Sequence, residues 1–168
     1  MSETLSAMDR VSMALSRFSL LFSAFGLIGM TAIISWQVFA RYVLGASPAW
    51  AEQASLLLML WFILFAAAAG VREGFHIQLT MIQDRAKPVT RRRIRMFCHL
   101  VVMVFGLFMA VYGVELTRAV WSHAIPTLGL SRGWAYVPIA LSGALTAFFA
   151  LEQTLAEAKD KTVRPIWN

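Results

Sequence analysis

Four long stretches of the sequence contain no Asp, Glu, Lys or Arg. They are residues 18–40, which number 23, and residues 53–71, 96–114 and 133–151, which number 19 each. A helix of 19 residues is about 29 Å long, close to the roughly 30 Å thickness of the hydrocarbon core of a bilayer. A charge at mid-membrane costs about 2.5–3.5 kcal/mol on insertion scales, so uncharged stretches of this length are typical of membrane spans.

The composition favours the same interpretation. Apolar residues make up 59% of the chain and charged residues 14%, against about 45–50% and about 25% in soluble proteins. A soluble chain of 168 residues has too small an interior for that much apolar side chain. We therefore predict an all-α integral membrane protein, a single domain over residues 1–168 with four transmembrane helices at about 18–40, 53–71, 96–114 and 133–151.

The basic residues between these spans predict the orientation, because Lys and Arg concentrate in cytoplasmic segments. Only three lie on the side of the first and third loops: Arg41, Arg118 and Arg132. The other twelve lie in the two end segments and the middle loop: Arg10, Arg17, Arg72, Arg85, Lys87, Arg91, Arg92, Arg93, Arg95, Lys159, Lys161 and Arg164. We expect both termini and the middle loop to be cytoplasmic.

The middle loop also accounts for most of the net charge of the chain. It contains seven basic and two acidic residues, which gives +5 of the total of +6. A basic cluster beside membrane helices attracts anionic phospholipids, and we expect this role for Arg91, Arg92, Arg93 and Arg95. Nucleic-acid binding is not expected. Before this cluster, the apolar residues from Phe75 to Ile82 predict a short interfacial segment between the second and third spans, ended by Pro88.

Local patterns predict a turn and several close helix contacts. The residues from Gly45 to Pro48 predict a short turn, with Ser47-Pro48 at the start of the second helix. Small residues recur at four-residue spacing in the later helices, which favours tight packing in lipid. They are Ala66 and Gly70, Gly106 and Ala110, and Gly143 and Ala147.

The helix centres contain no ionisable residue of the kind that marks an ion or proton path. Two alternatives to a supporting role stay open. One is a self-sufficient oligomeric transporter or channel, whose path would be lined by the few polar residues of the spans. The other is a haem-binding redox subunit that uses His76 and His99 as iron ligands. The sequence favours neither, and we expect no catalytic residues, no bound metal and no cofactor.

Two segments resemble a known family. The first is RYVLGASPAWAE, residues 41–52, with an Arg after one helix and a Trp and an acid at the start of the next. The second is AAAGVREGFHI, residues 67–77, in which small residues precede an Arg and then His-Ile. With residues 127–138, they make the chain similar, from about residue 15 to 155, to the small permease subunit (Q-type, DctQ-like) of tripartite ATP-independent periplasmic (TRAP) transporters. The chain departs from the family pattern at Ala66, Gln53 and Thr80.

The resemblance implies a role that composition alone does not. In this family a large permease subunit carries the substrate and sodium sites, and a periplasmic substrate-binding protein delivers a carboxylate-type solute. The small subunit supports and scaffolds the large one in the bacterial inner membrane. On this basis we expect Arg41, Trp50 and Glu52 to organise one end of the first two helices. We expect Arg72 and His76 to do so at the other end, against lipid phosphate or the large subunit. The substrate stays undetermined.

Overall fold

The computed structural model describes residues 2–46, 48–74 and 88–158 and contains four long helices. These are α1 (Ser2–Tyr42), α2 (Ala49–Arg72), α4 (Pro88–Val120) and α5 (Val137–Ala158). A short 3₁₀ helix, η1 (Arg132–Ala135), precedes α5. All four long helices are long and apolar enough to cross a membrane, and the described ranges contain no strand. The predicted all-α membrane fold with four spans is confirmed.

Two of the helices, α1 and α4, extend well beyond the uncharged stretches that predicted them, whereas α5 begins at Val137, inside the stretch 133–151. α1 has 41 residues and α4 has 33, so they are about 60 Å and 50 Å long, against a hydrocarbon core of roughly 30 Å. The uncharged stretch marks only the part of a helix that lies in hydrocarbon. Charged residues outside the hydrocarbon are compatible with helix. The first stretch, residues 18–40, is therefore the C-terminal part of a helix that begins at Ser2 and ends at Tyr42.

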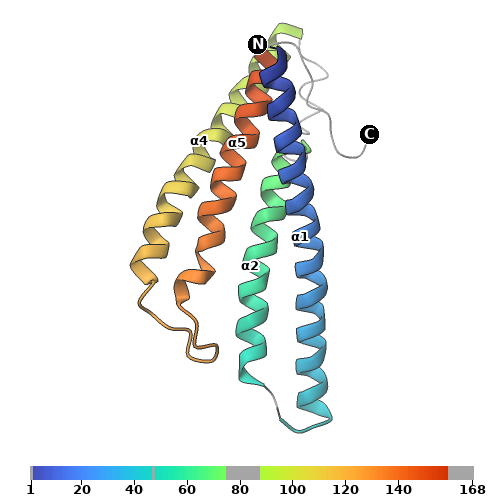
Figure 1. Cartoon of the computed structure of the whole chain (residues 1–168), viewed down its shortest axis with the longest axis vertical. Helices are drawn as coiled ribbons and strands as arrows, with labels where there is room; N and C mark the ends of the chain where they lie inside the picture. The colour runs from blue at the N-terminus through green and yellow to red at the C-terminus, as the bar shows by residue number, and fades with distance from the viewer. Residues whose placement is uncertain (1, 47, 75–87, 159–168) are drawn as a thin grey trace.

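The four helices form two antiparallel hairpins. α1 packs along α2, α4 packs along α5, and α2 and α5 join the two hairpins. Figure 1 shows the hairpins close together at the end that carries the N-terminus and diverging toward the opposite end. We call these the Arg72 end and the Gly45 end, after residues that lie there. The predicted interfacial segment, from Phe75 to Ile82, lies outside the described residues.

The predicted turn after the first helix is confirmed. α1 ends at Tyr42, and Gly45 follows with a positive φ of 67°. Its neighbour Ala46 donates a backbone hydrogen bond to the carbonyl of Ala40 at 3.1 Å. A glycine in the left-handed region with this six-residue hydrogen bond is the Schellman arrangement, which satisfies the last carbonyls of a helix. Pro48 then takes the N-cap position of α2.

Close contact between α4 and α5 depends on glycine. A Cβ added to Gly143 would lie 2.5 Å from the backbone nitrogen of Ala110, and one added to Gly106 would lie 2.7 Å from that of Ala147. Gly113 faces Ala140 in the same way, at 2.7 Å from its nitrogen. The predicted contacts at Gly106–Ala110 and Gly143–Ala147 are confirmed. These backbones approach so closely because no side chain separates them.

Candidate functional site

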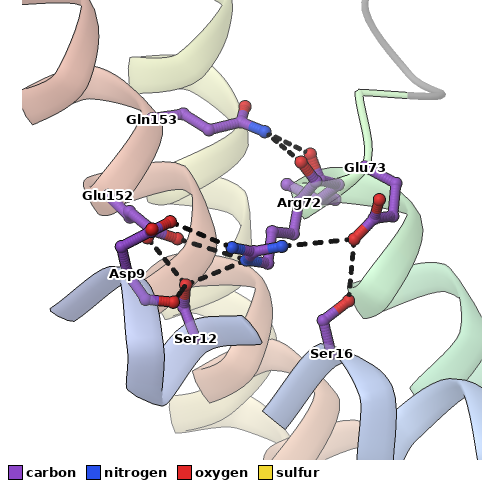
Figure 2. Close-up of polar contacts among 8 residues, drawn as sticks. Asp9, Ser12, Ser16, Arg72, Glu73, Glu152 and Gln153 are labelled. Carbon is purple, nitrogen blue, oxygen red and sulfur yellow. Dashed lines mark hydrogen bonds and ion pairs between the residues drawn. The ribbon is translucent and has the colours of Figure 1, made fainter. Parts of the chain in front are cut away.

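A buried cluster of polar side chains joins three helices at the Arg72 end of the molecule. Arg72, the last residue of α2, is only 2% exposed. Around it lie side chains from α1, from α5 and from the residue after α2 (Figure 2). We call this group the Arg72 cluster; it consists of Asp9, Ser12, Ser16, Arg72, Glu73, Glu152 and Gln153.

The guanidinium of Arg72 contacts three carboxylates and one hydroxyl. Its Nη2 lies 3.2 Å from Oδ1 of Asp9, and its Nη1 lies 3.3 Å from Oε1 of Glu73. Its Nε donates to the hydroxyl of Ser12 at 2.9 Å and lies 3.6 Å from Oε2 of Glu152. Burying a charge removes it from water, which costs free energy unless the charge is paired and hydrogen-bonded. Here the pairing comes from α1, α5 and the neighbouring residue of the same helix end.

Two serines of α1 complete the contacts of the carboxylates. The hydroxyl of Ser12 donates to Oε1 of Glu152 at 2.7 Å while it accepts from Arg72. One turn along α1, Ser16 donates to Oε1 of Glu73 at 3.1 Å. Both serines are fully buried. Because each hydroxyl links a side chain of another helix to α1, the cluster fixes how α1 lies against α2 and α5.

Gln153 ties α5 to the C-terminal end of α2. Its side-chain nitrogen donates to the carbonyls of Val71 and Arg72, at 2.6 Å and 2.9 Å. The last carbonyls of a helix have no partner within the helix, so this amide acts as an end cap supplied by a neighbour. The Arg72 cluster therefore binds both the guanidinium of Arg72 and the last backbone carbonyls of α2 to neighbouring helices.

The contacts of the Arg72 cluster hold α1, α2 and α5 together. Its arginine is enclosed by carboxylates and hydroxyls that are hydrogen-bonded to one another or to the arginine. Within the described ranges, no group of three or more His, Cys, Asp or Glu side chains could hold a metal ion.

The predicted basic cluster is divided between helix contacts and the surface. Arg95 donates to Oε1 of Glu157 on α5 from its Nε at 3.0 Å, and Arg92 donates to the carbonyls of Glu157 and Ala158. These two arginines link α4 to the C-terminal end of α5, where a positive charge is favourable. Arg93 is exposed. Arg91 lies on α4, but its side chain is outside the described part of the chain.

The other predicted site residues are not gathered at one place. Arg41, Trp50 and Glu52 are exposed at the Gly45 end. Among the described residues, neither Trp50 nor Glu52 forms a side-chain hydrogen bond or ion pair. His76 lies outside the described residues, and His99 is buried on α4.

Halfway along α2, tryptophans connect the two hairpins. The indole nitrogen of Trp61 on α2 donates to the carbonyl of Trp134 on η1 at 2.9 Å. The ring centroids of Trp61 and Trp134 are 6.2 Å apart, and Trp121 stands at the same distance from Trp134. Aromatic pairs at such distances stabilise contacts beyond the area that they bury. They connect the hairpins where the helices have already begun to diverge.

Sequence reasoning found Arg72 but missed most of its partners. Asp9, Ser12 and Ser16 lie in the N-terminal segment, for which the sequence predicts only a cytoplasmic location, and Glu152 directly follows the fourth predicted span. One signal was available, because Ser12, Ser16, Ser19 and Ser23 recur at spacings of four, three and four residues. All four are buried, and such spacing places them on one face of a helix.

The comparisons with known proteins identify a family of transporter subunits. The profile described as "Tripartite ATP-independent periplasmic transporters, DctQ component" matches residues 30–160. The chain is 23% identical, over 74% of its length and 72% of the relative, to the sialic acid TRAP transporter small permease protein SiaQ of Vibrio cholerae. It is 25% identical, over 68% of its length and 52% of the relative, to the C4-dicarboxylate TRAP transporter small permease protein DctQ of Rhodobacter capsulatus.

The match to a third relative covers a larger share of that protein than the matches to the first two do. The chain is 17% identical to a putative TRAP transporter small permease protein of Haemophilus influenzae, over 83% of this chain and 85% of the relative. The profile match and the four apolar helices indicate a multi-pass protein of the inner membrane. The chain therefore belongs to the DctQ component family of tripartite ATP-independent periplasmic transporters, a family of transporter subunits and not of enzymes.

Proposed function

We propose that the chain is the small membrane subunit of a TRAP-type secondary transporter. It supports and scaffolds a large permease subunit during the sodium-driven uptake of a carboxylate-type solute, which a periplasmic binding protein delivers. The names of two relatives refer to sialic acid and to C4-dicarboxylate. Both compounds carry carboxylates, which supports the proposed class of solute.

The single observation that carries the scaffold role is the Arg72 cluster. A scaffold needs its helices to keep a fixed arrangement, and a buried ion-pair network between helices provides this. In the Arg72 cluster, Arg72 is only 2% exposed and Glu152 only 3%, and both contact Ser12 of a third helix. Exchanging these partners would expose buried charges, which is strongly unfavourable. This rigidity supports a fixed part of the transporter.

The outward faces of α1 and α4 support a role beside another membrane protein. On α1, Phe25 is 72% exposed and Ile28 is 65% exposed; on α4, Phe105 is 61% exposed. Apolar faces of this kind suit lipid or an adjacent transmembrane helix. We propose that the large permease subunit covers part of this surface.

We also propose roles for the predicted site residues in the assembly. Arg41, Trp50 and Glu52 organise the Gly45 end, where the binding protein would approach if the termini are cytoplasmic. At the opposite end, Arg72 and His76 organise the helix ends. Of the predicted basic cluster (Arg91, Arg92, Arg93 and Arg95), the exposed Arg93 is the residue best placed to contact anionic lipid head groups, since Arg92 and Arg95 contact α5. Exposed basic side chains near the membrane surface are attracted to anionic phospholipids.

The test is uptake in vesicles that contain the large permease subunit and a sodium gradient, with the binding protein outside. Sialic acid and a C4-dicarboxylate are the first solutes to try. We expect uptake only when this chain is present, and reduced uptake with the Arg41→Gln and Glu52→Gln variants. Glu115→Gln, which removes an exposed carboxylate of α4, is the matched control and should transport normally.

Equal uptake without this chain would contradict the scaffold role. Transport by this chain alone would instead favour the self-sufficient transporter, and a haem absorption band in the purified protein would favour the redox subunit. Unchanged transport with both Arg41→Gln and Glu52→Gln would remove those two residues from the proposal while leaving the role of the subunit intact.

A further inference from the structure

A cleft of about 240 Å³ lies between α2 and the segment that joins α4 to α5. We call it the α2–η1 cleft. One wall is formed by α2 and the other by the connecting segment and η1. Its lining residues are Gln53, Leu56, Leu57, Leu60, Ile125, Pro126, Arg132 and Ala135.

The wall opposite α2 is held by its own hydrogen bonds. Ile125 donates its backbone N–H to the carbonyl of Leu130 at 2.7 Å, and Arg132 donates its own to the carbonyl of His123 at 2.7 Å. The hydroxyl of Ser131 accepts the N–H of Gly133 at the start of η1. The cleft is therefore formed before any ligand enters, which reduces the entropy lost on binding.

The lining of the α2–η1 cleft separates polar and apolar groups. Arg132 and Gln53 supply one cation and one amide, and the other lining residues are apolar. Arg132 is exposed, and its side chain forms no ion pair or hydrogen bond within the described ranges. An unpaired guanidinium beside apolar walls is complementary to an anion that carries an apolar chain.

The position of the cleft in the membrane specifies that ligand further. Arg132 is the first residue of the fourth candidate span, and Gln53 lies in the first turns of the second. Because the ends of a span lie near the head groups, we infer that both residues lie at this level. Leu60 lies about 10 Å deeper along α2 than Gln53, within the hydrocarbon. Leu56 is 51% exposed and Leu60 is 37% exposed, so an acyl chain can reach this wall from the bilayer.

We propose that the α2–η1 cleft binds one phospholipid. The phosphate lies at Arg132 and Gln53, and the upper part of one acyl chain lies along the leucines of α2. The lipid fills the space where the two hairpins diverge, next to the contact between Trp61 and Trp134. It thereby acts as part of the packing between the hairpins at the Gly45 end. This site is separate from the basic cluster of α4, which lies at the opposite end.

The experiment is native mass spectrometry of the full chain after extraction from vesicles of phosphatidylethanolamine and phosphatidylglycerol. We expect one phospholipid to stay bound per chain through detergent washing. The Arg132→Gln variant should lower this occupancy about tenfold, because a hydrogen bond to a charged group contributes about that factor or more. Arg118→Gln, which removes an exposed arginine of α4 outside the cleft, should retain the lipid.

A second variant tests the apolar half of the site. Leu56→Trp fills the cleft from an exposed position on α2, where a larger side chain leaves the helix packing intact. It should release the lipid while Arg132 is still present. A photoactivatable acyl chain on phosphatidylglycerol should crosslink to the segment from Leu56 to Leu60 in the wild-type chain and not in this variant.

Three results would overturn the proposal. Arg132→Gln and Leu56→Trp could both retain the lipid as the wild type does. Inorganic phosphate at millimolar concentration could displace the signal, which would identify a soluble-anion site. The complex with the large permease subunit could lose both the retained lipid and the crosslink, which would show that protein covers the cleft. None of these results bears on uptake, so this inference fails or stands independently of the proposed function.

Discussion

The Nε of Arg72 and the Oε2 of Glu152 lie 3.6 Å apart inside the protein, and the hydroxyl of Ser12 contacts both side chains. The arginine ends α2, and the carboxylate belongs to α5. This contact is therefore one of the points at which the first hairpin is bound to the second. Because three helices contribute to it, its loss affects the whole bundle.

Arg72→Gln should destabilise the protein by about 3–5 kcal/mol, because it leaves the buried carboxylate of Glu152 without a cation. Denaturation in detergent micelles measures this change. Arg93→Gln removes an exposed arginine near the same end and should change the free energy of unfolding by less than about 0.5 kcal/mol. The double variant Arg72→Gln/Glu152→Gln should lose less than the sum of the two single variants, since the pair interacts directly. Strict additivity would contradict the contact.

Gly143→Ala should separate α4 from α5. The added Cβ would meet the backbone of Ala110 at 2.5 Å, and overpacking of this kind costs about 1–3 kcal/mol. Gly29→Ala is the matched control, because a Cβ at Gly29 of α1 would meet no atom within 4 Å. It should be neutral or stabilise the helix by up to about 1 kcal/mol. Melting temperatures of the two variants distinguish these outcomes, and equal melting temperatures would contradict the close contact.

Trp61→Phe should loosen the contact between the hairpins, and so let their Gly45 ends move further apart. The substitution keeps an aromatic ring and removes the hydrogen bond to the carbonyl of Trp134, at a cost of about 1 kcal/mol. Spin labels at the exposed positions Val43 and Ser122 should report a broader distance distribution. Trp50→Phe, at an exposed tryptophan near the same end, should leave the distribution unchanged. A narrow distribution in Trp61→Phe would show that ring contacts alone hold the hairpins.

The orientation predicted from Lys and Arg can be tested by cysteine labelling. Cys98 is the only cysteine in the chain, so Cys98→Ser gives a background without thiols. In that background, Ser122→Cys should react with a membrane-impermeant maleimide in spheroplasts, because the loop that carries it is predicted to be periplasmic. Thr90→Cys should react only after the membrane is opened. The reverse pattern would mean that the termini are periplasmic.

Much of the fold could be predicted from the sequence because the bilayer imposes a simple rule. Three of the four uncharged stretches lie wholly in a long helix, and the fourth lies in η1 and α5. The turn at Gly45 and the contact of Gly106 with α5 also agreed with prediction. These features depend on local composition: apolar side chains enter hydrocarbon, a glycine permits a positive φ, and a missing Cβ permits close approach. The lengths of α1 and α4 could not be predicted this way, since charged ends are compatible with helix or loop.

The sequence by itself determined that this chain is a four-helix membrane protein, and it placed Arg72 at the end of a span. Only the tertiary structure decided what surrounds that arginine. A charge at a span edge can face lipid phosphate or a buried carboxylate, and both satisfy the same local pattern. The packing of α1 and α5 against α2 brings Asp9, Ser12 and Glu152 to Arg72 from distant parts of the chain. Contacts between distant residues depend on how helices pack, which no local pattern of apolar and charged residues records.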